Sequence, residues 1–211
     1  MSQPGPKSQT SREEAQNTRA IFIACAALGR EVRRIIKKHG WNAEFLAIDG
    51  RLHLFPKRIG ETVEGYLKQA DGRYGRRIVV YGHCGVTNLD DILEKHNAIR
   101  PPGPHCYEMY GNELFAQMIR EEPATYFLTD YLVQAWDKFV VRGLKIDEQP
   151  GMKEVLFHHF KRVAYFSQEE NETLVAQAQA IADWMGLPLI VKHVGYGDLE
   201  RRLVALMEGQ E

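Results

Sequence analysis

The sequence predicts an α/β protein with a mostly parallel β-sheet and helices on both faces, a doubly wound arrangement like that of Rossmann folds. Strand-like apolar runs alternate with helical patterns along most of the chain, which is typical of parallel sheets with crossover helices. The run at residues 76–81 stops abruptly at Gly82-His83-Cys84-Gly85. A buried parallel strand that delivers side chains to the carboxyl edge of a sheet ends in this way.

The length of 211 residues favours one α/β domain over residues 19–211, with two small related halves sharing a core as the alternative. Residues 1–18 are polar and lack the apolar core of a signal peptide, so we expect a disordered tail there. With 27 basic and 28 acidic side chains, the chain has no electrostatic footprint for nucleic acid. No apolar run approaches the roughly 20 residues that cross a bilayer, and we expect a cytoplasmic protein without membrane contact.

Each predicted strand is a short apolar run bounded by turn residues or a helical pattern. Apolar residues spaced three and four apart, often followed by a glycine, predict the helices. The predicted strands are residues 20–24, 44–48, 76–81, 98–100, 124–128, 162–166 and 188–192. The predicted helices are residues 28–39, 57–70, 89–96, 107–120, 131–141, 152–160, 169–185 and 199–207, and residues 51–56 are expected to form a loop.

The three cysteines of the chain, Cys25, Cys84 and Cys106, all fall at predicted strand ends or in connecting loops. In the cytoplasm cysteines stay reduced, and they serve as ligands or nucleophiles more often than as disulfides. Soft thiolates select zinc, copper(I) or an iron–sulfur cluster. Three thiolates leave one position open on a tetrahedral zinc or on the fourth iron of a [4Fe-4S] cluster, and an open position suits catalysis. We therefore predict a three-cysteine metal site, while a buried free cysteine also occurs as a small hydrophobic residue.

Two histidines, His83 and His105, each precede one of these cysteines. Neighbours in an extended strand point to opposite faces, so a loop is needed for both members of a pair to bind one metal. Either histidine is alternatively a proton donor, a substrate-binding group or a packing residue. Glu108 and Asp130 are candidate acids at the site edge, although a helix cap or a surface charge explains each equally well.

A metal-free enzyme is the competing hypothesis. Cys84 lies between two glycines just before a predicted helix, whose dipole is expected to lower the pKa of the thiol. His83 or His105 would then act as the base for a cysteine nucleophile.

Five ordered motifs resemble a prokaryotic family labelled domain of unknown function 1638, over nearly all of residues 21–206. The motifs are Ile23-Ala24-Cys25-Ala26-Ala27-Leu28, Tyr81-Gly82-His83-Cys84-Gly85, Gly103-Pro104-His105-Cys106-Tyr107-Glu108, Phe127-Leu128-Thr129-Asp130-Tyr131-Leu132 and Gly195-Tyr196-Gly197-Asp198-Leu199-Glu200. The family pattern often has Asp before the middle cysteine, where this chain has His83, so the resemblance implies no fixed catalytic duty for that histidine.

The resemblance implies an association with corrinoid-dependent methyl transfer. We therefore expect a metal-dependent enzyme, a transferase or lyase acting on a small molecule, or an accessory factor of one-carbon metabolism, with a corrinoid protein or methyltransferase as a partner. Zinc sites that activate thiols occur in such chemistry. The non-enzymatic alternative is a binding module that docks a corrinoid protein or carries a metal.

Overall fold

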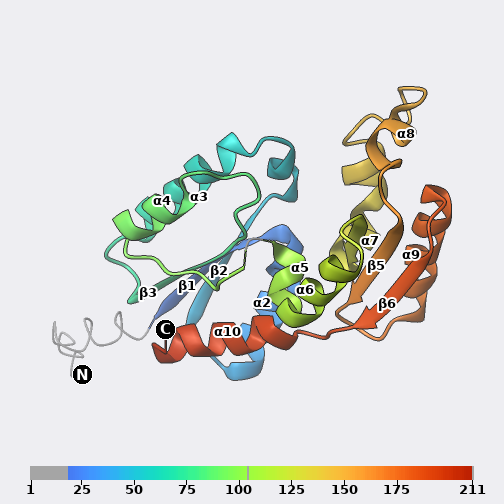
Figure 1. Ribbon diagram of the computed structural model, residues 1–211. Helices are drawn as coiled ribbons and strands as arrows, with labels where there is room; N and C mark the ends of the chain where they lie inside the picture. The colour runs from blue at the N-terminus through green and yellow to red at the C-terminus, as the bar shows by residue number, and fades with distance from the viewer. Residues whose placement is uncertain (1–18, 104, 211) are drawn as a thin grey trace, which may run out of the picture. The chain divides into compact units, whose positions relative to one another are not determined.

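The computed structural model describes residues 19–103 and 105–210, so the predicted tail at residues 1–18 lies outside the described part (Figure 1). The chain divides into two compact units. Unit 1 runs up to Pro101 and takes in the last residues from Val204, and unit 2 is Pro102–Leu203.

Unit 1 contains a three-stranded parallel sheet in the order β2-β1-β3. Strand β1 (Ala20–Cys25) is central and buried along its whole length, as expected for a strand with neighbours on both sides. It pairs with β2 (Ala43–Ile48) on one side and with β3 (Arg76–Val80) on the other.

The crossover helices of unit 1 cover opposite faces of this sheet. Helix α2 (Ala26–His39) joins β1 to β2, and α3 (Lys57–Ala70) joins β2 to β3 on the far side of β1. Because the two connections run in opposite directions across the sheet and such crossovers are right-handed, the helices lie on different faces. Helix α4 (Leu89–Lys95) packs beside α3 (Figure 1).

Unit 2 contains a second three-stranded parallel sheet in the order β4-β5-β6. Its strands are β4 (Thr125–Thr129), β5 (Arg162–Ser167) and β6 (Leu189–His193). Both connections run in the same direction, so their helices share one face. Those connecting elements are α7 (Asp130–Trp136), the π-helix η2 (Asp137–Val141), α8 (Met152–Phe157) and α9 (Glu172–Met185).

The core of unit 2 has two parts that follow the alternation of side chains along the strands. Leu128 and Tyr165 pack against residues of α7 and α9, such as Trp136 and Ile181. On the other face, Phe127, Ala164 and Phe166 pack against α6 (Asn112–Glu121), which follows the short helix α5 (Cys106–Tyr110). The last helix is α10 (Gly197–Glu208).

The predicted α/β class, with parallel strands and intervening helices, is confirmed. The strands are divided between two sheets, whereas the alternating pattern had suggested one. Because each unit has its own sheet, the single domain over residues 19–211 stays a prediction.

Three smaller predictions differ from the structure. Residues 107–120 form two helices, because the N–H of Asn112 donates to the carboxylate of Asp198 (3.0 Å) and a new helix begins there. Residues 98–100 make only an isolated bridge, between Ile99 and Ile78. The expected loop at 51–56 contains a 3₁₀-helix, η1 (Gly50–Leu54), which Asp49 caps by accepting from the N–H of Arg51.

Across residues 19–103 and 105–210, none of the helices combines the length and the apolar character that crossing a bilayer requires.

Candidate functional site

The carboxyl ends of the three parallel strands of unit 1 meet at one edge of the sheet. This sheet has a topological switch point, because the chain leaves β1 for β2 on one side and then crosses to β3 on the other. In open parallel sheets ligands bind outside the carboxyl ends of the strands at such a point. Cys25 ends β1, and Tyr81–Gly85 directly follow β3, so the switch point lies beside two of the three cysteines.

Cys25 is almost completely buried, with 2% of its surface exposed. Burial raises the pKa of its thiol to about 12, because a thiolate loses its hydration there. A hydrogen bond from the backbone of Ala27 acts in the opposite direction. The negative charge of ionised Cys84 raises the pKa of Cys25 further.

His53, in η1, contacts Cys25 from the end of β2. Its Nε2 lies 4.0 Å from Sγ of Cys25, and its Nδ1 lies 3.0 Å from the carbonyl oxygen of Gly50. A carbonyl only accepts, so Nδ1 carries the hydrogen and Nε2 presents its lone pair toward the thiol. The imidazole ring stacks on Tyr81, with ring centroids 5.8 Å apart and planes 18° apart.

The sequence did not point to His53, because only strand ends that carry a cysteine were considered as site positions. Residues 51–56 were expected to form a loop without a functional residue. The signal that could have found it is the same switch-point rule, applied to every loop that follows a strand of the sheet.

Cys84 lies in a tight turn. The N–H of Val86 donates to the carbonyl of His83 (2.6 Å), and the two central residues, Cys84 and Gly85, have φ of +42° and +81°. Positive φ at both positions is the pattern of the mirror-image type I′ turn. The predicted lowering of the Cys84 pKa is wrong: α4 begins only at Leu89, and burial raises that pKa.

His83 is half-buried and faces charged neighbours. The guanidinium of Arg100 donates to its Nε2 at 2.7 Å and to Asp90 at 2.9 Å. The hydrogen bond from Arg100 is the largest cause that lowers the pKa of Asp90. The imidazole is therefore held as an acceptor within an ion pair.

Three predicted site residues belong to unit 2 and cluster around α5. Cys106 begins this helix and is half-buried. The ring of His105 lies 5.2 Å from that of Tyr107, in an aromatic cluster that includes Phe115, so a packing role fits it. Glu108 lies in the first turn, and its buried Oε2 has no hydrogen-bond partner within residues 19–103 and 105–210.

Asp130 follows β4 and has no exposed surface. Its Oδ1 accepts from the hydroxyl of Tyr165 (2.6 Å) and the N–H of Gln168 (3.0 Å), and its Oδ2 accepts from the N–H of Glu169 (3.1 Å). A buried carboxylate with this many donors joins the ends of β4 and β5, which favours a structural role over an acid at an open site.

The structure thus brings Cys25, Cys84 and His53 to the edge of unit 1, and His83 belongs to the same unit. The remaining predicted site residues belong to unit 2; they are His105, Cys106, Glu108 and Asp130. In the part of the chain that the structure describes, no group of three or more His, Cys, Asp or Glu side chains is placed to hold a metal ion. The donor atoms at the edge of unit 1 are nevertheless of the thiolate and imidazole types that zinc and iron–sulfur centres use.

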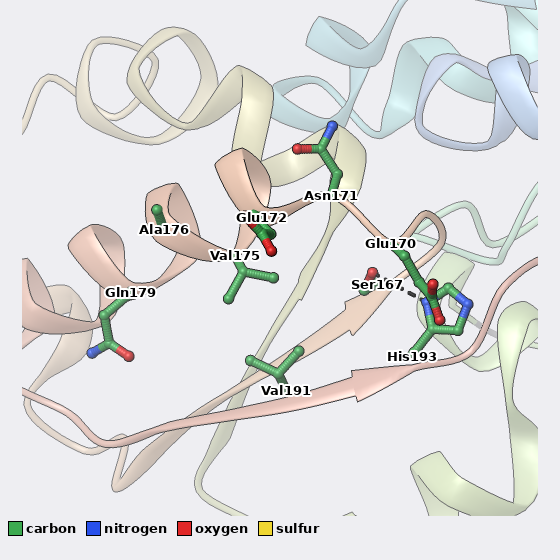
Figure 2. Close-up of a pocket in the computed structure, with 9 residues that line it drawn as sticks. All are labelled: Ser167, Glu170, Asn171, Glu172, Val175, Ala176, Gln179, Val191 and His193. Carbon is green, nitrogen blue, oxygen red and sulfur yellow. Dashed lines mark hydrogen bonds between the residues drawn. The ribbon is translucent and has the colours of Figure 1, made fainter.

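Unit 2 also has an open groove of about 670 Å³ beside the carboxyl ends of β5 and β6 (Figure 2). Ser167 and His193 stand at one end, with Oγ and Nδ1 3.4 Å apart, and Ser167 donates to the carbonyl of Glu169. The rest of the lining is Glu170, Asn171, Glu172, Val175, Ala176, Gln179 and Val191. Sequence reasoning did not single out this groove, because its residues come from separate elements and form no motif.

The fold and the edge of unit 1 define a parallel α/β protein that bears cysteine and histidine at its strand ends. A family model described as protein of unknown function (DUF1638) matches residues 47–203, and the chain belongs to this family. The matched range includes His53, Cys84 and Cys106 and begins after Cys25. No curated protein matches the chain. The expected family is confirmed; four of the five motifs lie within the matched range, and the first, at residues 23–28, lies before it.

Proposed function

We propose that this protein binds a metal through the thiolates of Cys25 and Cys84, and acts as a metal-dependent enzyme or accessory factor of corrinoid-linked methyl transfer or one-carbon metabolism. One observation carries the metal proposal. Cys25 is the last residue of β1 and Cys84 lies in the turn after β3, and these adjacent parallel strands border the switch point of the sheet.

The donor set fits a zinc ion or an iron–sulfur cluster, since both prefer thiolates. Bound there, the metal would supply thiol or substrate activation at an open coordination position. Cys106, the third predicted ligand, belongs to unit 2 and is tested by its own substitution. The substrate in this proposal is a small molecule, and the partner is a corrinoid protein or methyltransferase. That partner rests on the family resemblance alone. The cytoplasmic location, where thiols stay reduced, is part of the same proposal.

The second candidate function is a cysteine nucleophile at Cys84. The specific observation in its favour is the positive φ of Cys84 in the turn after a strand, because nucleophiles often lie on such strained turns. Burial opposes it, because burial lowers the fraction of reactive thiolate.

Metal content separates the two candidates. The protein is purified without oxygen, and its zinc, iron and acid-labile sulfide are measured together with a visible spectrum. About one zinc, or about four irons and four sulfides, per chain supports the proposal. Cys25→Ser and Cys84→Ser should then each lose the metal, and Cys106→Ser tests the third ligand. Protein that binds neither metal nor cluster, with all three thiols free, overturns the metal proposal and favours the nucleophile.

A further inference from the structure

We propose that Nε2 of His53 is a metal ligand, and that it forms with Sγ of Cys25 the pre-arranged half of the site at the edge of unit 1. This inference rests on the proposed metal binding and names a ligand that the three-cysteine prediction does not contain. Cys84, on its two-residue turn, supplies the next donor when the ion binds.

The first support is the state of the imidazole. Nδ1 donates to the carbonyl of Gly50, so the ring is fixed in the tautomer whose Nε2 is unprotonated. Histidines that bind metals usually donate their other ring nitrogen to a carbonyl or carboxylate, which sets both the tautomer and the orientation of the ring.

The second support is distance. On a tetrahedral zinc, with Zn–S about 2.3 Å and Zn–N about 2.0 Å, the sulfur and nitrogen atoms lie about 3.6 Å apart. Sγ of Cys25 and Nε2 of His53 are 4.0 Å apart, so a small closing movement reaches that separation. The same distance is long for a hydrogen bond, and a direct bond between thiol and imidazole is therefore a weak account of the contact.

The third support is the way the two side chains are held. Tyr81, which is fully buried, stacks on the imidazole and limits its rotation. The capping of η1 by Asp49 fixes the backbone that carries His53. His53 itself is exposed, whereas Cys25 is buried, so an ion from solvent meets the imidazole first and then the thiol.

Cobalt(II) and zinc test the inference directly. Metal-free, reduced protein is titrated with Co²⁺, whose thiolate bonds absorb in the near ultraviolet, and zinc affinity is measured by competition with a chromophoric chelator. His53→Ala should weaken zinc binding by about a hundredfold or more, since even the partners that only orient ligands cost 10–100-fold. His53→Cys should retain binding and increase the thiolate absorption, because one more sulfur reaches the ion.

His158→Ala is the matched control, because His158 is an exposed histidine at the end of α8 in unit 2. Its zinc affinity should equal that of the unsubstituted protein, and thermal unfolding monitored by circular dichroism shows that each variant is folded. If the unsubstituted protein shows no thiolate–cobalt absorption and contains no iron–sulfur cluster when purified without oxygen, the proposed metal function fails. If that protein binds and folded His53→Ala binds equally well, only the role of His53 is overturned.

Discussion

The two parallel sheets of this protein differ in strand order and in the residues at the carboxyl ends of their strands. In unit 1 the strand order β2-β1-β3 creates a switch point, whereas the order β4-β5-β6 in unit 2 runs in one direction and creates none. At the edge of unit 2, the buried carboxylate of Asp130 is enclosed by donors from β5 and the residues after it. At the edge of unit 1, Cys25 meets a histidine that is open to solvent.

This difference separates a group that holds the fold together from a group that is available to a ligand. Asp130 directs both carboxylate oxygens to protein donors, and its substitution should act on stability. The Nε2 lone pair of His53 points toward a sulfur atom at 4.0 Å, a weak contact that a metal ion would improve. We therefore expect a structural role for Asp130 at the edge of one sheet and a ligand-binding role for His53 at the edge of the other.

The largest expected effect on folding is that of Asp130→Ala. The substitution removes the carboxylate that accepts from the Tyr165 hydroxyl and from the N–H groups of Gln168 and Glu169, and each buried hydrogen bond lost in this way costs about 1–3 kcal/mol. We expect the free energy of unfolding to fall by about 3–5 kcal/mol, measured by urea denaturation. Tyr165→Phe, which removes one donor and keeps the carboxylate, should cost only about 1–2 kcal/mol. A loss of metal without a loss of stability would show that Asp130 belongs to a ligand site.

Much of the fold could be predicted from local pattern, because buried β-branched runs such as residues 76–81 are strands wherever they pair. The division into two sheets could not, since the order of the strands depends on pairing between distant segments. The break between α5 and α6 has the same origin, because Asp198 accepts from Asn112 across 86 positions of sequence.

At the candidate site, the positions of Cys25 and Cys84 at neighbouring strand ends followed from the sequence. The partner of Cys25 did not. His53 reaches Cys25 because it lies in η1, a 3₁₀-helix that follows β2. The sequence of η1 has no apolar periodicity from which this helix could be predicted. The enclosure of Asp130 was equally hidden, because its donors come from β5 and from the residues that follow β5.

The next effect concerns thiol reactivity in the metal-free protein. Only the thiolate reacts with iodoacetamide, so a raised pKa slows alkylation at every pH below that value. With a pKa of about 12, Cys25 should react at pH 8 at least about a hundredfold more slowly in the folded protein than in the same protein in urea. Cys84, whose pKa burial also raises, should be slowed less.

Mass spectrometry of the peptides containing each cysteine gives both rates between pH 7 and 11, and the unfolded protein is the reference for each thiol. Faster alkylation of Cys84 in the folded protein than in urea, near pH 7, would contradict the prediction that burial slows this thiol. It would mean that this thiol is activated, as a nucleophile requires.

A smaller effect is expected from Gly85→Ala in the turn beside Cys84. Gly85 has φ of +81°, and an added Cβ would lie 3.2 Å from Cβ of Pro56, so both strain and crowding oppose alanine. We expect a loss of about 1–2 kcal/mol in the free energy of unfolding together with weaker metal binding. Gly65→Ala in α3, where a Cβ meets nothing within 4 Å, should instead stabilise the protein by up to about 1 kcal/mol. Equal effects of the two substitutions would show that the turn imposes no special conformation.

The smallest effect tests whether the groove residues of unit 2 are structural, as Asp130 is. The side chain of Asn171 accepts from the N–H of Leu174 (3.2 Å) and caps α9, so Asn171→Ala should cost about 1 kcal/mol. Gln179→Ala, in the same groove but in the middle of the helix, should change stability by less than about 0.5 kcal/mol. Both variants should retain the metal content of the unsubstituted protein. A loss of metal in either one would extend the ligand site to the edge of unit 2 and remove the distinction between the two edges.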